Sequence, residues 1–139
     1  DSDIVFSPEH LIKLLNHDTD IVSGLYLMEG GKNFATVKDW DTEFFAKNRY
    51  FRFLSPADVE KAAGLVEVAY TGMGFMLVKK GVFESMEYPW FEPRKHEING
   101  IVDYSMEDVS FCLRASEKGF KVFVDPKVKV GHEKSSVLR

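Results

Sequence analysis

The chain has 139 residues, of which 45% are hydrophobic and 14% aromatic, so it can bury a core as one domain over residues 1–139. Its formal net charge is -4 and its Lys and Arg residues are scattered, which argues against a nucleic-acid groove or a basic membrane patch. Its apolar stretches, roughly six to eight residues, are too short to span a bilayer. The single Cys112 excludes an internal disulfide and a cysteine-based zinc site, so we expect a reducing, cytoplasmic location.

The first third of the chain predicts a helix followed by two strands. Ser7 is a suitable N-cap, Pro8 is favoured at the first helical position, and apolar residues then recur at helical spacing, so we expect a helix over 8–17. β-Branched and apolar residues predict a strand over 20–28, which a Gly-Gly turn follows. A second strand is expected over 36–40.

The segment 41–63 is rich in aromatic residues and follows no clear period, so we expect a lid or a loop there. Ser55-Pro56 resembles the start of a helix. Several of the aromatic residues are assigned to the core, namely Phe44, Phe45, Tyr50 and Phe51.

The middle of the chain predicts two strands joined by a bend. Residues 65–70 and 75–78 have strand character, and the two glycines within 71–74 indicate a bend or a close approach of the backbone. A short helix is expected over 79–86. The stretch 88–104 is aromatic and has neither a helical nor a strand period, so we expect a long loop.

The last third predicts a helix and two strands. Ser105 is expected to cap a helix that ends at Gly119, and strands are expected over 122–124 and 128–130. Strands and helices therefore intermix along the chain, which predicts an α/β fold with a mixed sheet flanked by helices.

An acidic pair at the start of the chain indicates a metal site. Carboxylates two residues apart fall on one side of an extended or tightly turned backbone, so Asp1 and Asp3 together can bind a hard divalent cation. A solvated acidic segment is the alternative. His132 alone is more often a surface or core residue than a ligand, so it counts only together with the two carboxylates.

A second acidic pair, Glu107 and Asp108, admits two interpretations. Ser105-x-x-Asp108 fits a capping box, in which the Asp108 carboxylate reaches back to the Ser105 amide. A carboxylate at a helix N-terminus is also kept ionised by the helix dipole and can accept a proton from an attacking hydroxyl. The two interpretations can hold for different residues of the pair.

Taken together, the order and spacing of these patterns resemble the catalytic half of the nucleotide-diphospho-sugar glycosyltransferases of the GT-A fold, above all the family-2 group. The resemblance runs from residue 1 to about 134. In chain order, the matching residues are Asp1-Ser2-Asp3, Tyr70-Thr71-Gly72-Met73-Gly74-Phe75-Met76-Leu77, Val82-Phe83-Glu84, Glu107-Asp108-Val109-Ser110-Phe111-Cys112, Gly119, Val124-Asp125 and Gly131-His132.

The resemblance implies a site for Mn²⁺ or Mg²⁺ formed by Asp1, Asp3 and His132, with Asp3 favoured as the direct ligand. An imidazole beside two carboxylates favours Mn²⁺ over Ca²⁺. The cation would hold and neutralise the diphosphate of a sugar-nucleotide donor. Lys134 can add positive charge there, although a solvated lysine is the favoured interpretation.

The resemblance also implies the catalytic roles. Asp108 would remove the proton from a hydroxyl of a carbohydrate or other acceptor as it attacks the anomeric carbon, which inverts the configuration. Glu107 would orient the acceptor or the loop. Trp90 either stacks on a sugar ring or closes the core. The other substrate contacts are expected where the backbone passes close to the donor sugar, at Gly72, Met73 and Gly74.

Members of this family have further strands and helices before the first acidic pair. We therefore expect the chain to be the C-terminal half of such an enzyme, weak or inactive alone, and to self-associate through uncovered sheet edges. One alternative is a non-enzymic binding domain in which the second acidic pair only caps a helix. A metal-dependent phosphohydrolase that begins on the first acidic pair is another.

Overall fold

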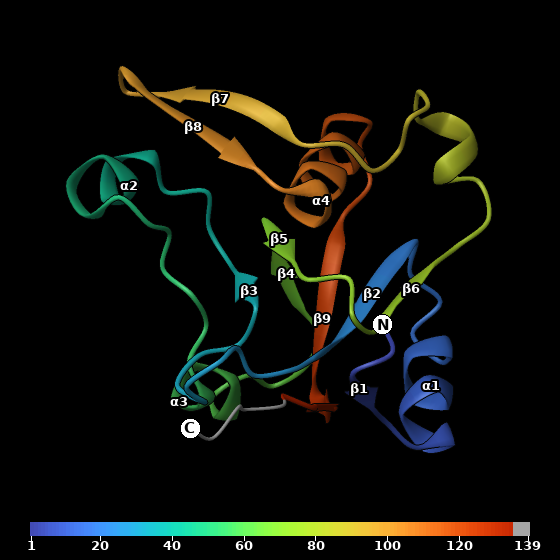
Figure 1. Cartoon of the computed structure of the whole chain (residues 1–139). Coiled ribbons are helices and arrows are strands. Elements are labelled where there is room, and N and C mark those ends of the chain that lie inside the picture. The colour runs from blue at the N-terminus through green and yellow to red at the C-terminus, as the bar shows by residue number, and fades with distance from the viewer. Residues whose placement is uncertain (135–139) are drawn as a thin grey trace.

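The structure, a computed structural model, describes residues 1–134 and contains a mixed four-stranded sheet with a helix on each face (Figure 1). The strand order is β4-β9-β2-β6, with β4 at Val66–Val68, β9 at Val122–Lys129, β2 at Ile21–Leu25 and β6 at Met76–Val78. β2 and β9 run parallel, whereas β4 and β6 are antiparallel to their neighbours. The prediction of an α/β fold with a mixed sheet is confirmed.

The side chains of β2 alternate between two hydrophobic clusters, one on each face of the sheet. Ile21 belongs to a cluster that contains Phe111 of α4 (Glu107–Glu117), whereas Val22 belongs to a cluster that contains Leu14 of α1 (Pro8–Leu15). This follows from the period of two residues in a strand. All four side chains are almost completely buried, and each such burial stabilises the fold by about 1.5–3 kcal/mol.

Helix α1 begins where the sequence predicts but ends two residues earlier. Ser7 is its N-cap, Pro8 occupies its first position, and the His10 ring accepts a hydrogen bond from the Ser7 amide. Leu14 is its buried residue, while its other large apolar side chains are exposed, namely Leu11, Ile12 and Leu15. None of the helices within residues 1–134 is long and apolar enough to cross a membrane.

The prediction of a lid or loop over 41–63 is wrong, because the segment contains two short helices, α2 (Thr42–Asn48) and α3 (Pro56–Glu60). The Asp41 carboxylate accepts a hydrogen bond from the Phe44 amide and so caps α2. Ser55 caps α3 in a reciprocal capping box with Asp58, as the Ser-Pro pair indicated. Both caps satisfy amides that a helix leaves unpaired at its start.

The aromatic residues of this segment divide between core and surface. Phe45 and Phe51 are buried and stack on each other with a centroid distance of 4.8 Å, whereas Tyr50 is 55% exposed. The core assignment is therefore wrong for Tyr50. Nearby, β3 (Thr36–Val37) pairs with β5 (Tyr70–Thr71) outside the main sheet.

The helix expected over 79–86 is reduced to one short 3-10 turn, η1 (Phe83–Ser85). Gly81 adopts a φ of 104°, in the left-handed region that a regular helix does not use, so no helix continues through it.

The prediction of an irregular loop over 88–104 is also wrong. Two strands, β7 (Arg94–Ile98) and β8 (Ile101–Ser105), form a hairpin that extends away from the main sheet (Figure 1). The residues between them, Asn99 and Gly100, have φ values of 50° and 76°. Positive φ at both turn positions favours Asn-Gly in two-residue hairpins, so this dipeptide is the sequence signal for the hairpin.

At the end of the described chain, the two predicted strands over 122–130 merge into β9, which continues through Pro126 to Lys129. A separate short strand, β10 (Gly131–His132), then pairs antiparallel with β1 (Ile4–Val5). This pairing joins the two ends of the described chain.

Candidate functional site

The pairing of β1 with β10 brings two of the predicted metal-site residues together. Ile4 lies opposite His132, and the Glu133 amide donates to the Asp3 carbonyl oxygen at 2.7 Å. As a result, Oδ2 of Asp3 lies 3.1 Å from Nε2 of His132, although the two residues are 129 positions apart. Strand pairing alone therefore places the carboxylate beside the imidazole.

The orientation of the His132 ring is fixed through its other nitrogen. Nδ1 lies 2.9 Å from the Leu27 carbonyl oxygen, which can only accept, so Nδ1 carries a proton and donates it. In a neutral ring, the Nε2 lone pair then faces the Asp3 carboxylate. Two acceptors at this distance repel each other unless a proton or a cation lies between them. Metal-binding histidines are commonly oriented by a hydrogen bond from their other ring nitrogen, as Nδ1 of His132 is here.

Lys134 lies beside the same carboxylate, with its side chain about half exposed. Its Nζ is 3.3 Å from Oδ2 of Asp3. The hydrogen bond from Lys134 is the main reason that the pKa of Asp3 lies below its ordinary value, and the contact with His132 lowers it further. Asp3 is therefore ionised at neutral pH and can act as an anionic ligand.

Asp1 does not join this cluster. It is exposed, and its amino group donates to the Gly74 carbonyl oxygen at 3.4 Å. Within residues 1–134, no group of three His, Cys, Asp or Glu side chains is arranged to hold a metal ion. Asp3 and His132 nevertheless present one carboxylate oxygen and one imidazole nitrogen, a donor pair that fits Mn²⁺ or Mg²⁺ and leaves further positions for ligand oxygens.

The second acidic pair lies at the start of α4, but it does not form the expected capping box. Met106 is the N-cap, and no side chain caps the helix. The Ser105 hydroxyl instead lies 2.8 Å from Nε2 of His96 in the hairpin. The expectation that Ser105 caps this helix is therefore wrong, because a tertiary contact engages its side chain.

Asp108 is half-buried, whereas its neighbour Glu107 is exposed. Burial raises the pKa of Asp108 above its ordinary value, and the charge of Glu107 raises it further, while the hydrogen bond from the Val109 amide opposes the shift. No cation lies within ion-pair distance of Asp108 among residues 1–134. A desolvated carboxylate of this kind is a stronger base than a solvated one.

Tyr26 contacts both His132 and the glycine segment at 72–74, although its sequence pattern indicated only part of a strand. Its ring meets the His132 ring edge-on at a centroid distance of 5.0 Å. Its hydroxyl oxygen accepts a hydrogen bond of 3.4 Å from the Gly74 amide. A methyl group at Gly72 would overlap this hydroxyl oxygen and lie 2.9 Å from Cζ of Tyr26.

The two glycines of the 71–74 segment are thus explained by close packing of the chain on itself. A methyl group at Gly74 would lie 2.9 Å from both Ile4 and Tyr26. The close approach that the glycines indicated is present, and its partner within the described chain is the Tyr26 side chain. Contact of Gly72, Met73 and Gly74 with a donor sugar stays a prediction.

Trp90 packs on the edge of the core. Its ring is partly buried, lies 5.2 Å from the Phe83 ring and 5.5 Å from the Tyr88 ring, and its Nε1 is buried without a hydrogen-bond partner. Arg114 of α4 donates to the Trp90 carbonyl oxygen at 3.2 Å and so fixes the segment. Trp90 was expected either to stack on a sugar ring or to close the core, and in the structure it packs against the core.

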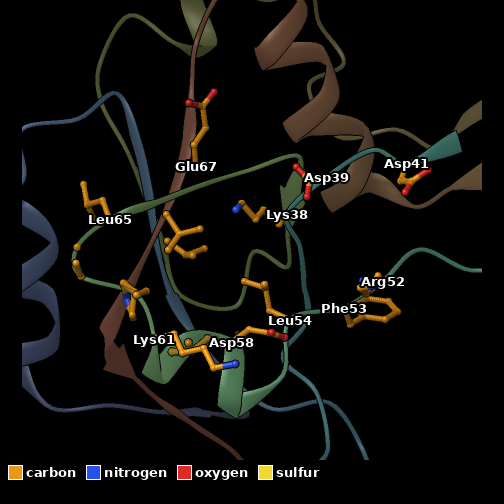
Figure 2. Close-up of a pocket in the computed structure, with 17 residues that line it drawn as sticks. Lys38, Asp39, Asp41, Arg52, Phe53, Leu54, Asp58, Lys61, Leu65 and Glu67 are labelled. Atoms are coloured by element: carbon orange, nitrogen blue, oxygen red, sulfur yellow. The ribbon is translucent and has the colours of Figure 1, made fainter. Parts of the chain in front are cut away.

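Two pockets lie near these elements. One, of about 350 Å³, is lined by the turn at 27–31 and by His132 and Lys134, so it adjoins the Asp3 cluster. The other, of about 720 Å³, contains none of the predicted site residues. Figure 2 shows Lys38 on one side of this second pocket and Lys61 on another, with Leu54 among the side chains that line it.

Comparison with known proteins identifies no family for this chain. No protein-family model and no curated protein matches the chain. Among solved structures, the chain is similar to A197 from STIV, with a TM-score of 0.49 and 18% sequence identity. The similarity covers 100% of this chain and 66% of A197, so the chain spans about two thirds of the length of A197.

Proposed function

We propose that this chain forms the metal- and acceptor-binding part of a GT-A glycosyltransferase, which transfers a sugar from a nucleotide-diphospho-sugar to an acceptor hydroxyl. The observation that carries the proposal is the pair formed by Asp3 and His132, in which the bond to the Leu27 carbonyl directs Nε2 of the imidazole toward an ionised carboxylate. That arrangement suits a divalent cation.

In this proposal, Asp3 and His132 hold Mn²⁺ or Mg²⁺, which when bound neutralises charge on the leaving diphosphate. The Lys134 ammonium, 3.3 Å from Asp3, lies where it can bind a diphosphate oxygen. Asp108 accepts the proton of the acceptor hydroxyl as that hydroxyl attacks the anomeric carbon, so the configuration inverts. Burial supports this role because it raises the pKa of Asp108 and so its affinity for a proton.

Thermal denaturation with Mn²⁺ and a nucleoside diphosphate tests the proposal. Ligands that bind only the folded chain stabilise it, by about 2.7 kcal/mol at a concentration of roughly 100 times Kd. We expect Mn²⁺ with UDP or GDP to raise the melting temperature of the chain, and Asp3→Ala to abolish the rise. The matched control is Asp39→Ala, which removes an exposed carboxylate from the second pocket and should preserve the rise.

The same measurement separates the alternatives. If neither Mn²⁺ nor Mn²⁺ with a nucleoside diphosphate shifts the melting temperature, the glycosyltransferase proposal fails and a non-enzymic binding domain is favoured. A covalent phosphate trapped on Asp1 would favour the phosphohydrolase instead. A rise that survives Asp3→Ala would show that nucleotide binds elsewhere on the chain.

A further inference from the structure

Tyr26 lies between His132 of the candidate metal site and the glycine segment at 72–74. It directly follows β2, and its ring lies edge-on against the His132 imidazole with an interplanar angle of 74°. Its hydroxyl group lies over Gly72, where no side chain separates it from the backbone. The phenol therefore extends from the metal-site histidine toward the glycine segment.

The surroundings of Tyr26 favour the protonated form of its hydroxyl. Burial is the main cause that raises the pKa of Tyr26, and the charges of Asp108 and then Asp3 raise it further. At neutral pH the hydroxyl keeps its proton.

The hydrogen bonds of this hydroxyl leave its proton available. A tyrosine hydroxyl offers one donor and accepts through its oxygen. The oxygen accepts from the Gly74 amide, while no acceptor for the proton occurs among the described residues. The Tyr26 side chain is also only partly buried. A donor held in place without an acceptor is suited to an oxygen of a bound substrate.

We propose that Tyr26 is a positioning residue that donates a hydrogen bond from its phenol to a hydroxyl oxygen of the transferred sugar. This inference rests on the proposed function, because it places a sugar between the cation held by Asp3 and the base Asp108. In this arrangement the nucleoside diphosphate would bind on the His132 side of the ring, whereas the hydroxyl lies over Gly72. Tyr26 therefore contacts the sugar and leaves the diphosphate to Asp3, His132 and Lys134.

Calorimetric titration of the Tyr26→Phe variant tests this role. The substitution keeps the ring against His132 and removes only the hydroxyl. Each protein is titrated in the presence of Mn²⁺ with two matched pairs of probes, UDP with UDP-glucose and GDP with GDP-mannose. A lost hydrogen bond corresponds to a rise in Kd of about two- to tenfold. We expect that rise for the nucleotide sugar that the unmodified chain binds, and a change of less than about twofold for the corresponding nucleoside diphosphate.

The control is Tyr50→Phe, which removes the hydroxyl of an exposed tyrosine and should leave both affinities unchanged. Equal affinities of Tyr26→Phe and the unmodified chain for the nucleotide sugar overturn the inference but leave the proposed function intact. An equal loss for nucleotide and nucleotide sugar also overturns it, because a structural role affects both. If the unmodified chain binds neither probe, the proposed function fails and the inference fails with it.

Discussion

The close contact between Gly72 and Tyr26 gives a prediction that does not depend on function. In Gly72→Ala, the new methyl group overlaps the Tyr26 hydroxyl oxygen and lies 2.9 Å from Cζ, so either the phenol or the backbone must move. Overpacking of this kind costs about 1–3 kcal/mol. We expect urea denaturation, followed by tryptophan fluorescence, to show that loss in the free energy of unfolding.

A double-mutant cycle identifies the cause of the loss. In the Tyr26→Phe background, the overlapping oxygen is absent, so Gly72→Ala should cost less, with a coupling free energy of about 1 kcal/mol or more. The matched control is Gly64→Ala, because a methyl group there meets no atom within 4 Å. It should be neutral or stabilise the chain by up to about 1 kcal/mol. An equal cost of Gly72→Ala in both backgrounds would refute the packing argument.

Two further predictions concern buried charge. Because the pKa of Asp108 is raised in the folded chain, ionisation of this carboxyl destabilises the fold as the pH rises above the ordinary pKa of 3.8. Asp108→Asn should therefore increase the free energy of unfolding at pH 7. This gain should shrink as the pH falls toward 3.8. Urea denaturation at several pH values measures this, and a loss of stability at pH 7 would contradict it. The buried Asp125 carboxylate lies 2.6 Å from Nε2 of His17. His17→Ala removes this partner, so that the carboxylate keeps only the hydrogen bond from the Lys127 amide. The expected cost is about 1–3 kcal/mol by the same assay, and an unchanged midpoint would show that Asp125 does not need the imidazole.

Local signals predicted the features that depend on neighbouring residues. Ser7-Pro8 marked the start of α1, and Ser55-Pro56 marked the start of α3, because a helix N-terminus is capped by residues adjacent in sequence. The Asn99-Gly100 turn carried an equally local signal for the hairpin, but the surrounding aromatic residues obscured the strand period. The Ser105 cap failed because His96, in the neighbouring strand, binds the same hydroxyl.

The candidate site was also predicted only in part from the sequence. The sequence alone supplied the chemical types, two carboxylates in Asp3 and Asp108 and an imidazole in His132, and with them the hypothesis of a metal site and a base. Only the tertiary structure brought Asp3 to His132, through a pairing of strands that lie at opposite ends of the described chain. It also placed Tyr26 against His132 and Gly72. Such contacts depend on which strands pair and in which register, and a residue's own neighbours do not determine either.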